Sequence, residues 1–174
     1  DYLYINNGDK TFTESINRYC NNTSQFSMGV DIADMNNDGW ADIFTTDMMP
    51  YEEEVALVSG GEDTENIKRI KEDFGFETQY ARNHFQLNSG KGYFSDIAQY
   101  TRTFATDWSW SVLLQDFDNN MLNDVFITTG IVKRPNDLDY INYLTSIDTM
   151  KNLSQKEKNK KLLDKMPSQA MKNV

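Results

Sequence analysis

The sequence has few of the residue types on which many active sites depend. It contains one cysteine and one histidine, so it cannot form an internal disulfide, and few zinc sites or histidine-dependent catalytic schemes are open to it. No apolar run approaches the ~20 residues of a membrane span, so no transmembrane span is expected in this segment. The 17 Lys and Arg residues are outnumbered by 27 Asp and Glu and form no basic stripe, so nucleic acid is not an expected partner.

Short polar side chains dominate what is present. The 174 residues include 18 Asp and 18 Asn but only 9 Glu, a balance that favours turns, caps and cation-binding loops over helices. The net charge of -10 is uneven: residues 151–174 carry seven Lys against Glu157 and Asp164, a net +5, which leaves -15 for residues 1–150. With 22 aromatic residues (10 Phe, 9 Tyr and 3 Trp), the composition is that of a globular chain rich in Asx turns.

The chain repeats itself with a period of 82 residues. Sliding the sequence by this amount requires no gap across some forty positions. The matched pairs are Asn6-Asn7-Gly8 with Asn88-Ser89-Gly90, Phe12 with Phe94, Ser27 with Ser109, Val30 with Val112, Asp34 with Asp116, Asp42 with Asp124 and Phe44 with Phe126.

Each copy predicts two hairpins. The first, which we call the outer hairpin, has a Gly-containing turn, and the second, the inner hairpin, turns on an Asp-rich loop. The expected strands are 2–5 with 11–14 and 28–33 with 42–46 in the first copy, and 84–87 with 93–97 and 110–115 with 124–128 in the second. Strands this short and closely spaced favour a propeller blade or another antiparallel sheet over an α/β layer.

Three segments predict helices instead. Residues 51–82 are expected to form a helical insertion, with Thr64 as N-cap before apolar residues at helical spacing. Asn136 is the expected cap of a second helix. The capping box Ser154-Gln155-Lys156-Glu157 predicts a third, Lys-rich helix.

The inner hairpin of the first copy carries the most specific motif. Residues 34–42 read D-x-N-x-D-G-x-x-D, with oxygen-bearing side chains at positions 1, 3, 5 and 9, which are Asp34, Asn36, Asp38 and Asp42. With a backbone carbonyl at position 7 and a glycine for the sharp reversal, this set suits a hard cation such as calcium. Position 12 lacks the Glu of an EF-hand, and the flanks are strands. An Asx-rich hairpin turn with solvated charges is the alternative interpretation.

The second copy keeps the oxygen ligands but not the glycine. Asp116, Asp118, Asn120 and Asp124 occupy positions 1, 3, 5 and 9, and Met121 replaces the glycine. Because a bulky residue is costly at a position that often needs positive φ, the sequence predicts a weaker second site with relaxed geometry.

Taken together, these hairpins and acidic loops resemble the FG-GAP/VCBS repeat, the blade unit of integrin-α-type, seven-bladed β-propellers. Within that group the chain is similar to bacterial surface proteins of the ASPIC/UnbV and cartilage-acidic-protein-like type, over about residues 1–145. The runs that carry this second resemblance are 4–12, 27–34, 46–50, 105–110 and 134–140.

The resemblance implies a mainly β fragment of a propeller, built from antiparallel blades with α-helical insertions. Residues 1–50 would hold the outer hairpin of one blade and the inner hairpin and calcium loop of the next. Residues 51–82 would be a helical insertion, residues 83–130 an outer hairpin followed by an inner hairpin with the second calcium loop, and residues 131–174 a helical insertion or tail. Such a chain cannot close a propeller, so it is expected to be a segment of a larger protein.

The resemblance also implies ligands, partners and location. Calcium would be held by Asp34, Asn36, Asp38, the Trp40 carbonyl and Asp42, and likewise by Asp116, Asp118, Asn120, the Leu122 carbonyl and Asp124. The expected partners are the other blades and an outer-membrane protein such as a SusC/SusD-type, TonB-dependent transporter. The expected location is extracellular or at the cell surface of a Gram-negative bacterium, anchored to the outer membrane, as in a lipoprotein.

A lectin and an enzyme are the two alternative functional classes. A lectin-like propeller could offer Trp108, Trp110, Asp107 and Tyr140 to a glycan, although a Trp-x-Trp run beside a strand more often packs a core. An enzyme is not expected, because loops whose oxygens saturate a calcium ion leave no open coordination position, and no nucleophile elbow or phosphate loop occurs.

Overall fold

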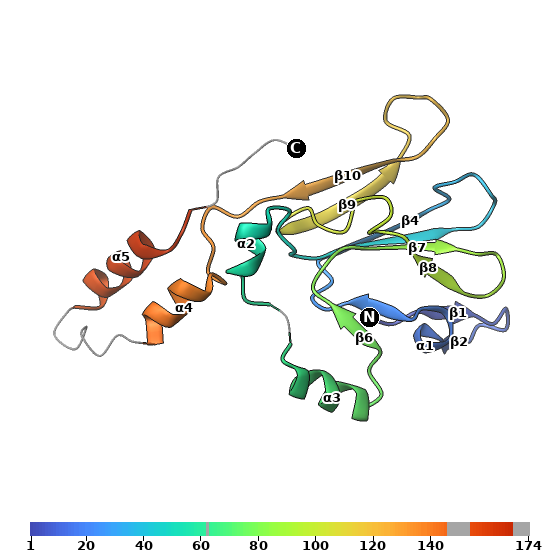
Figure 1. The fold of residues 1–174 in the computed structure, drawn as a ribbon. Coiled ribbons are helices and arrows are strands. Elements are labelled where there is room, and N and C mark those ends of the chain that lie inside the picture. Colours follow the sequence, from blue (N-terminus) through green and yellow to red (C-terminus); the bar gives the residue numbers. More distant parts are fainter. Residues whose placement is uncertain (62, 146–153, 169–174) are drawn as a thin grey trace. The chain divides into compact units, whose positions relative to one another are not determined.

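The protein is mainly β, as expected. A computed structural model describes residues 1–61, 63–145 and 154–168 (Figure 1). The strands are β1 (Tyr4–Asn6), β2 (Phe12–Glu14), β3 (Asn22–Ser24), β4 (Gly29–Ala33), β5 (Asp42–Thr46), β6 (Thr78–Tyr80), β7 (His84–Asn88), β8 (Phe94–Asp96), β9 (Ser109–Gln115) and β10 (Asp124–Thr129). The helices are α1 (Ile16–Tyr19), α2 (Glu53–Leu57), α3 (Glu65–Asp73), α4 (Leu138–Thr145) and α5 (Gln155–Lys165).

A four-stranded antiparallel sheet, in the order β4-β5-β7-β8, is the largest sheet among the described residues. It joins two of the expected hairpins, because β5 pairs with β7 with Phe44 opposite Phe85. The other two expected hairpins, β1–β2 and β9–β10, each form a two-stranded antiparallel sheet. The expected strands are therefore confirmed, with boundaries that differ by one or two residues.

The main core lies between this sheet and the β9–β10 hairpin. Phe44 is fully buried, and its ring centroid lies 5.5 Å from that of Phe85. Val112 and Leu114 on β9 and the small Ala98 complete the buried cluster. Burying one such side chain contributes about 1.5–3 kcal/mol, so this cluster holds the hairpin against the sheet.

The helices begin close to the expected residues, with one different cap. Thr64 is the N-cap residue of α3, although its side chain makes no capping hydrogen bond. The capping box of Ser154 and Glu157 is present on α5. At α4, Asp137 and not Asn136 caps the helix, since its carboxylate accepts from the backbone N–H of Tyr140 at 2.8 Å.

The expected helical insertion 51–82 is only partly helical. It contains α2 and α3 but ends in β6, which pairs in parallel with β3. The prediction missed this pair because a three-residue strand has too short a pattern to reveal its period.

The described residues divide into two compact units. One unit is built from residues 1–49 and 62–129, and the other from residues 50–61 and those from 130 onward. Within the second unit, the backbone N–H of Gly60 donates to the Asn136 carbonyl at 2.7 Å. No described helix is long and apolar enough to cross a membrane. The segment boundaries proposed from the sequence stay a prediction.

Candidate metal centre

The first acidic loop, residues 34–42, is organised by its own carboxylates. Asp34 accepts from the backbone N–H groups of Asp38 at 3.1 Å and Gly39 at 2.8 Å. Asp38 in turn accepts from the backbone N–H of Trp40 at 2.9 Å. Gly39 has φ +89°, the left-handed conformation that glycine adopts without a steric penalty. The glycine therefore makes the reversal that lets its backbone N–H reach Asp34, whereas Asp34, Asp38 and Asp42 do not form one of the converging carboxylate groups found among the described residues.

The second acidic loop, residues 116–124, repeats this hydrogen-bond pattern. Asp116 accepts from the backbone N–H groups of Asn120 at 3.0 Å and Met121 at 2.8 Å. The Asn120 side-chain oxygen accepts from the backbone N–H of Leu122 at 2.8 Å. Partial desolvation raises the pKa of Asp116, but the N–H donors outweigh it and hold that pKa below its ordinary value. The two loops thus share one conformation as well as one spacing.

Met121 adopts the conformation that a glycine would favour. Its φ is +70°, and its side chain is 84% exposed at the loop surface. The prediction that this loop position needs positive φ is therefore confirmed. A non-glycine residue is disfavoured in this region of backbone conformation. Whether the second site is weaker stays a prediction.

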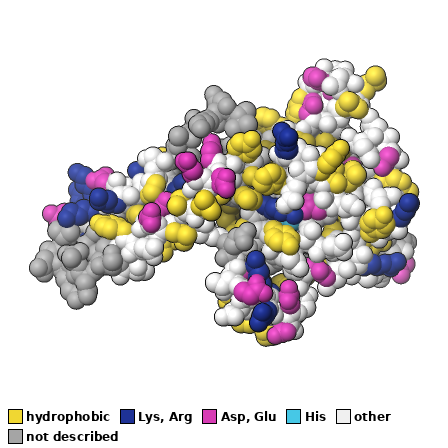
Figure 2. Space-filling model, viewed as in Figure 1, with side chains coloured by type: hydrophobic (Ala, Val, Ile, Leu, Met, Phe, Trp, Pro, Cys, Tyr) yellow, Lys and Arg dark blue, Asp and Glu magenta, His cyan; other side chains and the backbone are white. Residues whose placement is uncertain are grey.

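Three carboxylates converge in the second loop. Asp116, Asp118 and Asp124 each offer an oxygen, and these oxygens all lie within 4.8 Å of one another. Figure 2 shows acidic and hydrophobic side chains together at the tip of the β9–β10 hairpin. Among the described residues, this is the group of three His, Cys, Asp or Glu side chains close enough to share a metal ion.

Asp42, at position 9 of the first loop, is fully buried. Its two oxygens accept from the backbone N–H groups of Met35 at 2.9 Å and Asn88 at 2.8 Å. It therefore joins the start of its own loop to the end of β7. Since a carboxylate has about four lone-pair sites, these two bonds leave capacity for a cation.

The two loops contact each other directly. The Asn37 side-chain amide donates to the Met121 carbonyl at 3.0 Å, and the Asn123 amide donates to the Asp34 carbonyl at 2.8 Å. Each loop thus helps to position the other. No local pattern in the sequence predicts these contacts, because their partners lie 84 and 89 residues apart.

The sequence also did not reveal a buried charged cluster, in which Arg82, just before β7, and His84 on β7 meet Asp96 on β8. Asp96 lies 2.7 Å from the Arg82 guanidinium and 2.9 Å from Nδ1 of His84. Burial raises the pKa of Asp96, but the hydrogen bonds from His84 and Arg82 lower it well below its usual range. His84 Nε2 is buried and has no hydrogen-bond partner among the described residues. The single histidine of the chain was the only sequence signal for this cluster.

Cys20, the single cysteine, is buried. Burial, with Asp96 and Glu77 nearby, raises its pKa to about 11. The thiolate needed for nucleophilic chemistry is therefore scarce at neutral pH.

The residues considered for glycan binding do not share one environment. The rings of Trp108 and Trp110 lie 6.3 Å apart, and Trp110 is half exposed. Tyr140 is buried on α4 and presents no exposed face. Trp110 is therefore the exposed aromatic ring of this set, whereas Trp108 is partly buried, with its indole nitrogen inaccessible.

The antiparallel four-stranded sheet, with a flanking inner hairpin that repeats its acidic loop, is consistent with a fragment of a β-propeller. Residues 1–45 match the FG-GAP-like repeat family. This match supports a propeller-like protein-interaction module, of a kind that is generally non-catalytic and occurs in extracellular or cell-surface proteins. Comparison with curated proteins and with solved structures found no match.

Proposed function

We propose that this protein is a calcium-stabilised, non-catalytic interaction scaffold, a segment of a larger bacterial cell-surface propeller. The observation that carries the proposal is the convergence of Asp116, Asp118 and Asp124 within 4.8 Å. Like charges this close repel one another, and a divalent cation between them turns the repulsion into attraction.

The donor sets of both loops suit calcium. Each loop offers four oxygen-bearing side chains and one backbone carbonyl, that of Trp40 or Leu122. Calcium takes 6–8 oxygen ligands in flexible geometry, so water molecules would complete each shell. The hydrogen bonds within each loop orient the same carboxylates. The bound ion supplies positive charge and cross-links the two strands of an inner hairpin.

The proposed partners follow from this scaffold role. The other blades of the same protein and an outer-membrane protein, such as a SusC/SusD-type transporter, are the partners we propose. Pull-down from native outer membranes followed by mass spectrometry tests the second partner. Recovery of ribosomal or cytosolic proteins in place of membrane transporters would count against it.

Calcium removal tests the proposed function directly. Calcium at about 100 times its dissociation constant stabilises the fold by about 2.7 kcal/mol. For a chain of this size, we expect the melting temperature to fall by about 5–10 °C in excess chelator. Asp116→Asn should reduce this shift, whereas Asp139→Asn, at an exposed position on α4, should leave it unchanged. Identical melting curves with calcium and with chelator would exclude the proposal.

A lectin-like propeller is the second candidate. The half-exposed Trp110 beside Trp108 favours it, because aromatic faces stack on sugars through their apolar C–H groups. On a glycan array, Trp110→Ala should lose binding that a variant of the equally exposed Phe126 retains. An array on which the wild-type protein binds no glycan would remove this candidate.

A further inference from the structure

The two acidic loops meet within the unit of residues 1–49 and 62–129, at the tips of the β4–β5 and β9–β10 hairpins (Figure 1). Two side-chain amides join them: Asn37 of the first loop donates to the Met121 carbonyl, and Asn123 of the second loop donates to the Asp34 carbonyl. All four residues lie inside the loops that carry the proposed calcium ligands. The bonds therefore join the two proposed metal sites and not only the strands behind them.

In the first loop, the bond from Asn123 reaches a peptide unit that a proposed ligand also holds. The carbonyl of this unit belongs to Asp34 and accepts from Asn123 at 2.8 Å. Its N–H belongs to Met35 and donates to the Asp42 carboxylate at 2.9 Å. Asp42 is the proposed ligand at position 9 of the first loop. The second loop thus reaches this ligand through one peptide unit, which is planar and rigid.

The connection in the opposite direction has the same form. The Met121 carbonyl accepts from Asn37 at 3.0 Å, and the N–H of that peptide unit, which belongs to Leu122, donates to the Asn120 side-chain oxygen at 2.8 Å. Asn120 is the proposed ligand at position 5 of the second loop. Each loop therefore reaches a ligand of the other through a single peptide unit.

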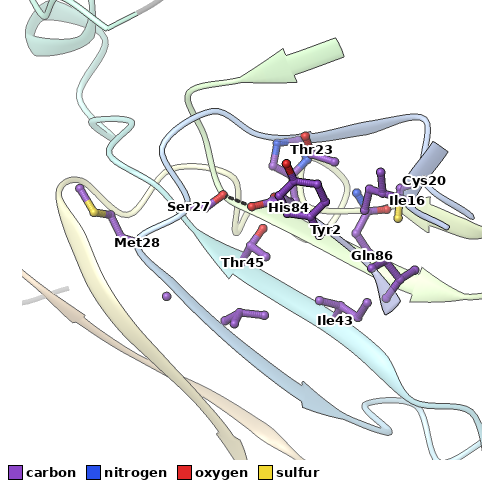
Figure 3. Close-up of a pocket in the computed structure, with 14 residues that line it drawn as sticks. Tyr2, Ile16, Cys20, Thr23, Ser27, Met28, Ile43, Thr45, His84 and Gln86 are labelled. Atoms are coloured by element: carbon purple, nitrogen blue, oxygen red, sulfur yellow. Dashed lines mark hydrogen bonds between the residues drawn. The ribbon is translucent and has the colours of Figure 1, made fainter. Parts of the chain in front are cut away.

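The contact between the loops does not involve the sheet face that borders a cavity. This cavity, of about 300 Å³ and shown in Figure 3, is lined from β5 by Ile43 and Thr45, and none of its lining residues belongs to either loop among the described residues. The repeat does not supply both amides either, because Ala41 stands at the position of the first loop that Asn123 occupies in the second. The pair of amides therefore belongs to these two loops, whatever covers the sheet.

We propose that Asn37 and Asn123 are positioning residues that couple the two calcium sites, so that an ion in one loop raises the affinity of the other. This inference rests on the proposed calcium function. An ion that fixes Asp42 also fixes the peptide unit beside it and, through Asn123, restrains the second loop before its own ion arrives. The second ion then removes less conformational freedom, which makes binding cooperative, and linkage makes the coupling reciprocal.

Charge acts in the opposite direction. An ion bound in one loop repels the ion that arrives at the other, although salt at physiological concentration screens this repulsion beyond about 8 Å. Replacing Asn by Ala alters no charge, so the repulsion is the same in both proteins. A comparison of Asn variants therefore cancels the electrostatic contribution and isolates the hydrogen bonds.

Terbium luminescence can report the first loop alone. Terbium, like calcium, is a hard cation that takes oxygen ligands, and its emission is excited through an indole ring beside the ion. Trp40 lies in the first loop, whereas residues 116–124 contain no Trp or Tyr. The excited emission of the wild-type protein should therefore follow the first site, and Trp40→Phe should remove it. Calorimetric titration with calcium measures the same affinities without a reporter.

A thermodynamic cycle tests the coupling. Asp116→Asn removes a ligand from the second loop, and the affinity of the first loop is measured with and without this substitution. The ratio of the two affinities should be about fivefold larger in the wild-type background than in Asn123→Ala, because one hydrogen bond between the loops is lost. Asn37→Ala should reduce the ratio less, since Asn37 is exposed and water competes with its bond, whereas Asn123 is half-buried.

Asn119→Ala is the matched control for Asn37→Ala. Asn119 stands at position 4 of the second loop, as Asn37 does in the first, and their φ values are +60° and +57°. Among the described residues its amide makes no bond to the first loop. The control should therefore keep the wild-type ratio. If Asn123→Ala does not keep the wild-type circular dichroism spectrum, Asn37→Ala against Asn119→Ala decides the question.

The outcomes separate this inference from the proposed function. Two occupied sites whose affinity ratio is the same in the wild-type, Asn123→Ala and Asn37→Ala backgrounds would overturn the coupling and leave the calcium function intact. A wild-type protein with no excited terbium emission and no calcium-dependent shift in melting would refute the calcium function and the coupling together.

Discussion

Gly39 and Met121 occupy the same position of two loops with the same hydrogen bonds. Both have positive φ, and both donate their backbone N–H to the first Asp of their loop at 2.8 Å. Only the glycine adopts this conformation without a steric penalty. The methionine has little to offset that penalty, because its side chain is 84% exposed.

Exchanging these residues should change stability in opposite directions. Left-handed backbone costs a non-glycine residue about 1–2 kcal/mol, and the greater freedom of glycine in the unfolded chain offsets about 0.5–1 kcal/mol of this. Met121→Gly should therefore raise the free energy of unfolding by up to about 1 kcal/mol, and Gly39→Ala should lower it by about 1 kcal/mol.

Urea titration with calcium present measures both changes. No atom lies within 4 Å of a Cβ at Gly39, so the expected loss there reflects backbone strain and not a clash. Equal midpoints for wild type and Met121→Gly would show that the loop relaxes around the methionine.

At the scale of elements, local sequence patterns predicted each hairpin but did not predict which residues the hairpins bring into contact. The strands of both inner hairpins were predictable because alternating side chains and an Asp-rich turn lie within twenty residues of each other. The cluster of Arg82, His84 and Asp96 was not, since β7 and β8 must pair before Asp96 reaches the other two.

Asp96→Asn tests how much this cluster stabilises the β7–β8 hairpin. The folded-state pKa of Asp96 lies below its ordinary value of 3.8, so its contribution is complete above that pH and is lost as the pH falls further. We expect the variant to lose about 2–3 kcal/mol at pH 7, because charged hydrogen bonds are weakened.

The pH dependence separates this effect from general damage to the fold. Wild-type stability should fall more steeply than that of Asp96→Asn below about pH 4. Asp139→Asn, at an exposed position, should follow the wild-type curve. Parallel acid profiles for wild type and Asp96→Asn would mean that another carboxylate dominates acid unfolding.

At the scale of the whole molecule, charge and architecture are linked. The six carboxylates of the two acidic loops belong to the part of the chain that carries -15, and two calcium ions would add +4. Both loops lie in the unit of residues 1–49 and 62–129, whereas the Lys-rich helix α5 lies in the other unit. The proposed calcium requirement therefore belongs to the first unit.

The sequence by itself determined the inner and outer hairpins, the acidic loops and the capping box of α5, because each depends on residues a few positions apart. It also determined the 82-residue repeat, which is found by comparing the chain with itself. Only the tertiary structure decided which distant groups meet. It brought the Asn37 amide to the Met121 carbonyl, paired β3 with β6, and buried Phe44 while leaving Phe126 exposed. Two equivalent residues with the same local sequence signals differ in this way because burial depends on which surfaces pack together, and no local pattern encodes that.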